Sequence, residues 1–238
     1  MMAGPLLLAL YEKVASKLAA RGPQREFDAI EERDNRVIIA GFGRVGQIVA
    51  RVLRARRIPF TALDINQTHV DFVRRFGNKI YYGDASRLDL LRAAGAEQAE
   101  IFVLAIDDVD ASLRTAELVH TKFPHLKIIA RARSRQHAFA LMDLNLHYIM
   151  RETFLSSLDM ATATLETLGE DAALARASVK RFRQHDEATL RTQYEVKEDE
   201  TKLIASSLEA AQQLEKLFEA DAAPRREDTL QVRARIER

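Results

Sequence analysis

The residues of this sequence best suited to chemistry are three glycines, Gly41, Gly43 and Gly46, spaced Gly-x-Gly-x-x-Gly. They follow the apolar run 36–40 and come directly before a helical pattern. Gly41 permits a tight turn, Gly43 lets the backbone approach a diphosphate, and Gly46 lets the helix lie close to the strand. The start of the helix favours a phosphate, and Arg44 either adds a charge to that phosphate or stays solvated. The turn therefore predicts a phosphate site formed by Gly41, Gly43, Arg44, Val45 and Gly46.

Asp64 ends the next apolar run, about twenty residues after the glycines, where an acidic residue hydrogen-bonds ribose hydroxyls. Its charge repels a 2′-phosphate, so AMP or NAD(H) is favoured over NADP. Two later stretches, 83–86 and 105–108, also follow apolar runs, and ligands bind at strand ends in this architecture. Asp84 has two interpretations, a contact to the adenine amino group or a cap for the next helix. The further candidate nucleotide-binding residues are Asp84, Ala85, Ala105 and Asp107.

Short apolar runs alternate with helical patterns from residue 36 to residue 150. The predicted strands are 36–40, 59–63, 79–82, 101–105, 127–130 and 147–149. The predicted helices are 47–56, 67–76, 87–94, 111–123 and 137–144. This alternation predicts an α/β fold, a Rossmann-like doubly wound parallel sheet covered on both faces.

The pattern changes on both sides of this nucleotide-binding domain. Residues 151–221 read as a helical C-terminal extension, with a helix over 154–168, a C-terminal cap at Gly169 and one long helix over 171–221. Residues 222–238 are highly charged and are predicted to be disordered. Residues 1–35 read as a helix and a connector. Their apolar start has two interpretations, the end of a transmembrane helix or a helix that packs on its own domain.

Composition and motifs exclude several classes of function. The chain has 36 Lys and Arg against 35 Asp and Glu, which gives no support for nucleic-acid binding. It has no cysteine, so thiolate metal sites and cysteine nucleophiles are excluded. We find no Tyr-x-x-x-Lys pair, no histidine at a helical or strand spacing from an evident carboxylate partner, and no metal-ligand spacing. The sequence therefore predicts a cofactor-type site without catalysis and without a metal.

Several blocks of the sequence together resemble a known family. They are Val37-Ile-Ile-Ala-Gly-Phe-Gly-Arg-Val-Gly-Gln-Ile48, Tyr82-Gly-Asp-Ala85, Phe123-Pro-His-Leu-Lys-Ile-Ile-Ala-Arg-Ala-Arg133 and Arg151-Glu-Thr-Phe154. They resemble the cytosolic regulatory (RCK or KTN) domain of Kef-type, glutathione-gated potassium efflux systems, over residues 2–217.

The resemblance implies a nucleotide held non-catalytically and glutathione bound as a gating ligand between two subunits. Arg51 and Arg151 match the family's arginines that meet glutathione carboxylates, and arginine forks suit carboxylates. Phe76 matches an aromatic residue that bulky glutathione adducts displace. Asp186 stands where one branch of the family has asparagine and another has aspartate.

The resemblance also implies a homodimer at the cytoplasmic face of the bacterial inner membrane, attached to the transmembrane antiporter domain of the same system. It further suggests an ancillary flavoprotein oxidoreductase as a partner. Two alternatives from other classes remain, an NAD-dependent oxidoreductase and a soluble nucleotide-binding subunit of a potassium uptake channel. The missing catalytic residues count against the first, and the helical tail counts against the second.

Overall fold

The computed structural model describes residues 26–30 and 35–236, with side chains up to residue 219. The predicted N-terminal helix and its apolar start lie outside these residues. Part of the connector is described: Asp28 accepts hydrogen bonds from the backbone N–H of Tyr82 at 2.6 Å and from Arg74 Nη2 at 2.6 Å. This piece of the connector is therefore fixed to the first half of the fold.

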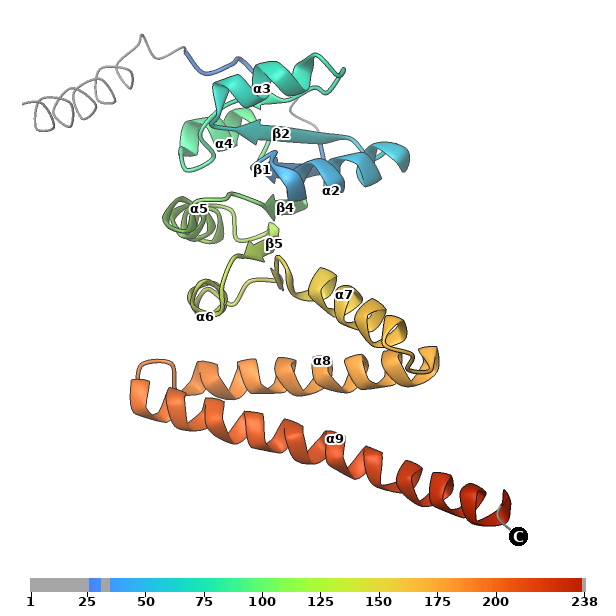
Figure 1. The fold of residues 1–238 in the computed structure, drawn as a ribbon. Coiled ribbons are helices and arrows are strands. Elements are labelled where there is room, and N and C mark those ends of the chain that lie inside the picture. Colours follow the sequence, from blue (N-terminus) through green and yellow to red (C-terminus); the bar gives the residue numbers. More distant parts are fainter. Residues whose placement is uncertain (1–25, 31–34, 237–238) are drawn as a thin grey trace, which may run out of the picture. The chain divides into compact units, whose positions relative to one another are not determined.

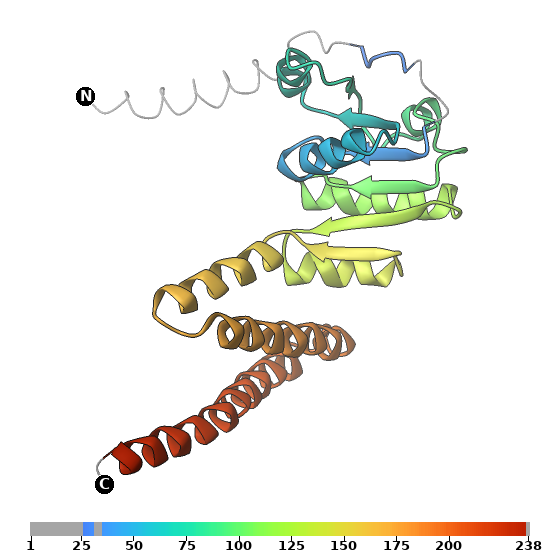
Figure 2. The same ribbon diagram turned by 90° about the vertical axis from the view of Figure 1, so that its right-hand side faces the viewer.

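The strands form a six-stranded sheet in the order β3-β2-β1-β4-β5-β6, which is the order of a doubly wound nucleotide-binding fold. The chain divides into two compact units, one ending at Ala99 and one beginning at Glu100. The predicted fold class is confirmed (Figures 1 and 2).

The first unit contains three parallel strands and their helices. Its elements are β1 (Val37–Ala40), α2 (Arg44–Ala55), β2 (Phe60–Asp64), α3 (Gln67–Arg74), β3 (Tyr81–Tyr82) and α4 (Leu88–Ala93). β2 pairs with β1 on one side and with β3 on the other. Ile38, Ile39 and Leu63 are fully buried, as expected for strands covered on both faces.

The second unit contains three more parallel strands, with α5 and α6 on one face of them (Figure 1). Its elements are β4 (Ile101–Leu104), α5 (Val109–Lys122), β5 (Lys127–Ala132), α6 (Arg135–Asp143), β6 (Tyr148–Arg151), α7 (Phe154–Thr167), α8 (Ala172–Glu195) and α9 (Glu200–Ile236). Phe102, Leu104 and Leu141 form part of its buried core.

Several helices begin before the first residue of the apolar pattern that predicted them. The reason is that the residue that caps the N-terminal end of each helix precedes this pattern. The side chain of Asp108 accepts a hydrogen bond from the N–H of Ala111 at 2.7 Å, so α5 starts at Val109. Ser134 caps α6 in the same way, through the N–H of His137 at 3.1 Å. The predicted cap at Gly169 is confirmed, since this residue has a φ of 94° and donates to Glu166 O at 3.1 Å.

The single long helix predicted over 171–221 is wrong. The chain turns at residues 196–199, and α8 and α9 run back along each other as a hairpin (Figure 1). Asp199 starts the second helix by accepting a hydrogen bond from the N–H of Lys202 at 3.1 Å. The local signal for this turn is the helix-capping Asp199, which follows the β-branched Val196. The apolar periodicity alone does not show this signal.

The charged tail also differs from the prediction of disorder. The backbone of residues 222–236 continues α9 as helix up to Ile236. Ala, Glu, Arg and Leu are strong helix formers, so a charged composition does not by itself prevent a helix from extending. The division of the chain at residues 150 and 221 remains a prediction.

Candidate functional site

The glycine turn, residues Gly41 to Gly46, joins β1 to α2. Gly41 has a φ of 91°, a left-handed conformation that favours glycine. Gly46 lies directly against it, because a Cβ atom on Gly46 would be 2.1 Å from the backbone oxygen of Gly41. Gly43 is the N-cap of α2 and makes no side-chain capping bond. The turn therefore presents backbone at the start of a helix, which is the arrangement that favours phosphate.

Asp64, at the end of β2, fastens this turn. Its carboxylate accepts a hydrogen bond from the N–H of Phe42 at 2.7 Å and from the N–H of Asn66 at 2.8 Å. His69 Nδ1 lies 3.6 Å from the same carboxylate, and its side chain also contacts Gln47 at 3.2 Å. Asp64 thus holds the turn in shape, a role that the sequence did not indicate, and His69 is a neighbour that the sequence analysis missed.

Asp84 and Ala85 follow β3 in the same unit. Asp84 accepts hydrogen bonds from the N–H and the hydroxyl of Ser86, at 2.9 and 2.7 Å. The N-cap of α4 is Arg87, so Asp84 shapes the turn ahead of that helix and does not cap it. Ala85 is buried, with 5% of its surface exposed.

In the second unit, the predicted residues Ala105 and Asp107 are held by a buried arginine. The guanidinium of Arg131 is 2% exposed and donates to the backbone oxygen of Ala105 at 3.1 Å. It also donates to Asp107 at 2.5 Å and to Glu152 at 2.7 Å. Arg133 adds a bond to the backbone oxygen of Asp107 at 3.1 Å. The ends of β4, β5 and β6 are thereby tied together by charge.

His137, in α6, packs against this group. Its Nδ1 accepts a hydrogen bond from the backbone N–H of Arg133 at 3.2 Å. Burial lowers the pKa of His137, and the positive charges of Arg131 and Arg133 lower that pKa further. His137 is therefore kept neutral, which suits a core residue that accepts a bond.

Arg151 and Asp186, two residues predicted to bind glutathione, form an ion pair. Arg151 ends β6, Asp186 lies in α8, and their side chains are 16% and 15% exposed. Arg135, at the start of α6, pairs with the other oxygen of Asp186. Arg151 also lies over the ring of Phe154, 3.7 Å from its centroid.

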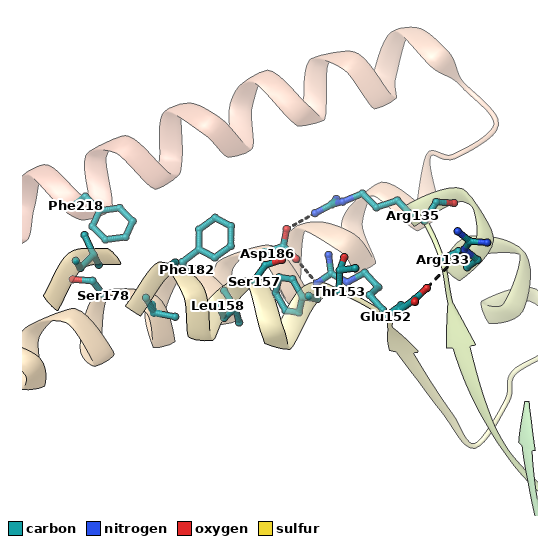
Figure 3. A pocket seen from close by; sticks show the side chains of 16 residues that line it. Arg133, Arg135, Glu152, Thr153, Ser157, Leu158, Ser178, Phe182, Asp186 and Phe218 are labelled. Carbon is teal, nitrogen blue, oxygen red and sulfur yellow. Dashed lines mark hydrogen bonds and ion pairs between the residues drawn. The ribbon is translucent and has the colours of Figure 1, made fainter. Parts of the chain in front are cut away.

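These three charged residues lie at a cavity of about 660 Å³ within the second unit. Figure 3 shows the aromatic rings of Phe182 and Phe218 further along it, away from Asp186. The cavity combines a charged end with an apolar wall, and its volume suits a small organic ligand. Its apolar lining includes Phe154, Leu158, Ala161, Leu165, Val179, Phe182 and Phe218.

Two family models match this chain. The model of the TrkA-N domain matches residues 37–152, and the model of the C-terminal domain of the potassium efflux system KefB matches residues 156–233. The chain is 44% identical over 183 residues to the glutathione-regulated potassium-efflux system protein KefC of Salmonella arizonae and to that of Klebsiella pneumoniae. These matches cover 77% of this chain and 29% of each relative, so the chain spans less than a third of their length.

A solved structure is also similar to this chain. The Kef C-terminal domain of Shewanella denitrificans, in its AMP-bound form, is 41% identical, with a TM-score of 0.63. The match covers 68% of this chain and 99% of that one. The chain belongs to the family of Kef C-terminal domains. Among its described residues, no helix is both long and apolar enough to span a bilayer.

The other predicted glutathione residues of this Kef domain, Arg51 and Phe76, lie in the first unit. Arg51 is exposed on α2. Phe76 follows α3, has 69% of its surface exposed and meets the edge of Phe72, with ring centroids 5.1 Å apart. Phe76 is therefore a surface residue and not part of the core.

Arg131 and Arg135 are two charged residues that the sequence analysis did not single out as site residues. Both belong to the alternating run Arg131-Ala-Arg-Ser-Arg135, which directly follows the predicted strand 127–130. Three arginines at the carboxyl end of a strand are a signal for anion binding in this architecture. In the structure the first is buried among acids and the third reaches Asp186.

Proposed function

We propose that this chain is the cytosolic, ligand-gated regulatory domain of a Kef-type potassium/proton antiporter. It holds an adenine nucleotide, AMP or NAD(H), for structure and not for catalysis. Glutathione or its conjugates act as the gating ligand. A gating ligand shifts an equilibrium between two states only by its different affinity for them.

The glycine turn supports the nucleotide part of the proposal. Gly41, Gly43 and Gly46 present backbone at the start of α2, and Asp64 clasps the turn through the N–H of Phe42. The relative from Shewanella denitrificans has AMP bound. We propose the same class of ligand here, contacted by the glycine turn with Arg44 and Val45, by Asp64, and by Asp84, Ala85, Ala105 and Asp107.

The observation that carries the proposal is the placement of Arg151. This arginine is 16% exposed and lies at the charged end of a cavity large enough for a tripeptide-sized molecule. Glutathione carries two carboxylates, and an arginine in a partly buried site binds a carboxylate strongly. The relatives named glutathione-regulated match the chain across this region.

The remaining residues and partners extend the proposal. Arg51 meets the second carboxylate of glutathione from another copy of the chain, and Phe76 is displaced by bulky adducts. A homodimer is then required, since the ligand is shared between subunits. The domain is attached to a transmembrane antiporter domain at the cytoplasmic face of the bacterial inner membrane, and an ancillary flavoprotein is a further partner.

A titration tests both ligands at once. The 238-residue chain is titrated by calorimetry with AMP, NAD, reduced glutathione and a bulky glutathione S-conjugate. We expect AMP to bind regardless of glutathione, and Arg151→Gln to weaken glutathione roughly tenfold or more while leaving AMP unchanged. Loss of both ligands in Arg151→Gln contradicts the two-site proposal, and hydride turnover with a bound nicotinamide cofactor contradicts a purely regulatory role.

A further inference from the structure

The carboxylate of Asp186 accepts hydrogen bonds from two arginines at the same time. Its Oδ1 accepts from Nη2 of Arg135, and its Oδ2 accepts from Nη2 of Arg151. The three side chains come from α8, from the start of α6 and from the end of β6. The side chains of Asp186 and Arg151 are largely buried, with 15% and 16% of their surface exposed, and that of Arg135 is partly buried, with 35% exposed.

This geometry is the one that a ligand carboxylate takes between two guanidinium groups. Each oxygen faces a separate arginine, and ionised donors and acceptors make the strongest hydrogen bonds. The pair of arginines is therefore already satisfied by a carboxylate that belongs to the chain. A ligand carboxylate that bridges Nη2 of Arg135 and Nη2 of Arg151 must replace that of Asp186, because two negatively charged carboxylates cannot occupy the same place between the two guanidinium groups.

The cavity shows where such a ligand lies. Arg135, Arg151 and Asp186 all line it, and its apolar wall continues past Phe182 toward Phe218 (Figure 3). A molecule with a carboxylate at one end and a less polar part at the other fits this distribution of charge.

We infer that Asp186 is an internal competitor for the ligand carboxylate, and that Arg135 is a further ligand-binding arginine beside Arg151. This inference rests on the proposed function, since it takes glutathione as the ligand. Asp186 is tethered to the site, so it lowers the apparent affinity for glutathione by the fraction of time that it holds the arginines.

Displacement of Asp186 also removes one of the contacts of α8, whereas the contacts near the C-terminal end of this helix remain. Near its C-terminal end, Gln193 accepts a bond from Nη1 of Arg135, the nitrogen that Asp186 does not use. Tyr194 donates to Asp143 at 2.9 Å, and Lys197 pairs with the same carboxylate. When a ligand carboxylate replaces that of Asp186 at the two arginines, α8 is therefore free to move about its C-terminal end. Ligand binding is in this way coupled to a movement of the helix.

Calorimetry on the full chain tests the competition. Reduced glutathione is titrated into the wild type, Asp186→Asn, Asp186→Glu and Arg135→Gln, and each variant's folding is checked by its melting curve. Removing the competing charge in Asp186→Asn tightens binding about tenfold, and the charge-retaining control Asp186→Glu does not. Arg135→Gln weakens binding about tenfold. Glutathione dimethyl ester has no free carboxylate, so its affinity does not increase in Asp186→Asn.

The results distinguish a failure of the competition at Asp186 from a failure of the proposed function. If glutathione binds the wild type and Asp186→Asn equally, or binds the variant more weakly, and Arg151→Gln abolishes binding, the competition is wrong and the proposed function stands. If glutathione binds none of the proteins, both are wrong.

A second measurement avoids any change at Asp186. The chain has no cysteine, so Gln136→Cys on α6 and Ala188→Cys on α8 accept spin labels only at those exposed positions. We expect saturating glutathione to lengthen or broaden the distance between the labels. An unchanged distance at saturation overturns the displacement of Asp186.

Discussion

The glycine turn of the first unit and the arginine cluster of the second are built in different ways. We define the arginine cluster as Arg131, Arg133, Arg135 and Arg151 with the acids Asp107, Glu152 and Asp186. The turn consists of consecutive backbone, fixed by a φ of 91° at Gly41 and by the contact of Gly46 with that residue. The cluster consists of side chains from segments far apart in the sequence, held by charge.

This difference teaches what each site can tolerate. A backbone site accepts most side-chain changes outside its glycines, since the ligand meets N–H groups that every residue but proline has. A side-chain site depends on each charged partner, because removing one leaves another partly buried and unpaired. A structural nucleotide suits the first kind of site, and a ligand that must come and go suits the second.

The largest expected effect would come from adding a methyl group to the turn. Gly46→Ala places a Cβ 2.1 Å from the backbone oxygen of Gly41, so α2 must move away from β1. We expect a loss of upwards of about 3 kcal/mol in the free energy of unfolding, measured by urea denaturation, and no AMP binding. Gly77→Ala is the matched control, since nothing lies within 4 Å of its added Cβ and only its φ of +73° opposes the change. Equal losses in the two variants would show that packing at the turn is unimportant.

The arginine cluster is tested most strongly at Arg131. Arg131→Met removes a 2% exposed guanidinium and takes away the Nη2 group that lies 2.7 Å from the carboxylate of Glu152, a side chain that is 12% exposed. We expect unfolding to become easier by about 2–3 kcal/mol. Arg133→Met, at a side chain that is 46% exposed, should cost less than about 1 kcal/mol in the same denaturation experiment. Similar values for both variants would mean that burial does not set the strength of this cluster.

A smaller effect is expected from a substitution of Asp64. It distinguishes the role of this residue in holding the glycine turn from its role in binding the nucleotide. Asp64→Asn keeps one oxygen acceptor but cannot accept from both Phe42 and Asn66 as the carboxylate does. We expect the nucleotide-free chain to lose about 1–2 kcal/mol of stability. The melting temperature is measured with and without AMP, because a contact to the ribose adds a further loss only when AMP is present. A variant that is destabilised only in the presence of AMP would show that Asp64 does not hold the turn.

The smallest expected effect concerns the pH dependence of stability. Burial lowers the pKa of His137 in the folded state, so the unfolded chain takes up a proton first as the pH falls below about 6.5. The contribution of His137 is complete above that pH and is lost as the pH falls toward the folded-state pKa, at a rate of at most about 1.4 kcal/mol per pH unit. His137→Gln should flatten the fall in unfolding free energy between pH 7.5 and pH 5.5, and so should His137→Asn, because neither amide side chain takes up a proton in this range. A slope that is the same in all three proteins would exclude this role for His137.

The local part of the molecule could be predicted from the sequence, because its causes are local. Each predicted strand and the glycine turn follow from neighbouring residues, through apolar periodicity and the freedom of Gly41. The helix hairpin was missed because residues 196–199 contain neither proline nor glycine, whereas the turn is set by the cap at Asp199. The resemblance to the Kef family indicated Arg151 and Asp186 as functional positions, but it did not indicate that they contact each other.

The sequence by itself determined the order of strands and helices between residues 36 and 150, the backbone of the glycine turn and the family to which the chain belongs. Only the tertiary structure decided that Asp186 pairs with Arg135 and Arg151, which lie 51 and 35 residues away, and that Asp64 fastens the turn through Phe42. The physical reason is the range of the forces involved. Backbone conformation depends on a residue and its neighbours, whereas the strength and partners of a charge depend on what the folded chain brings near it and on how much water it removes.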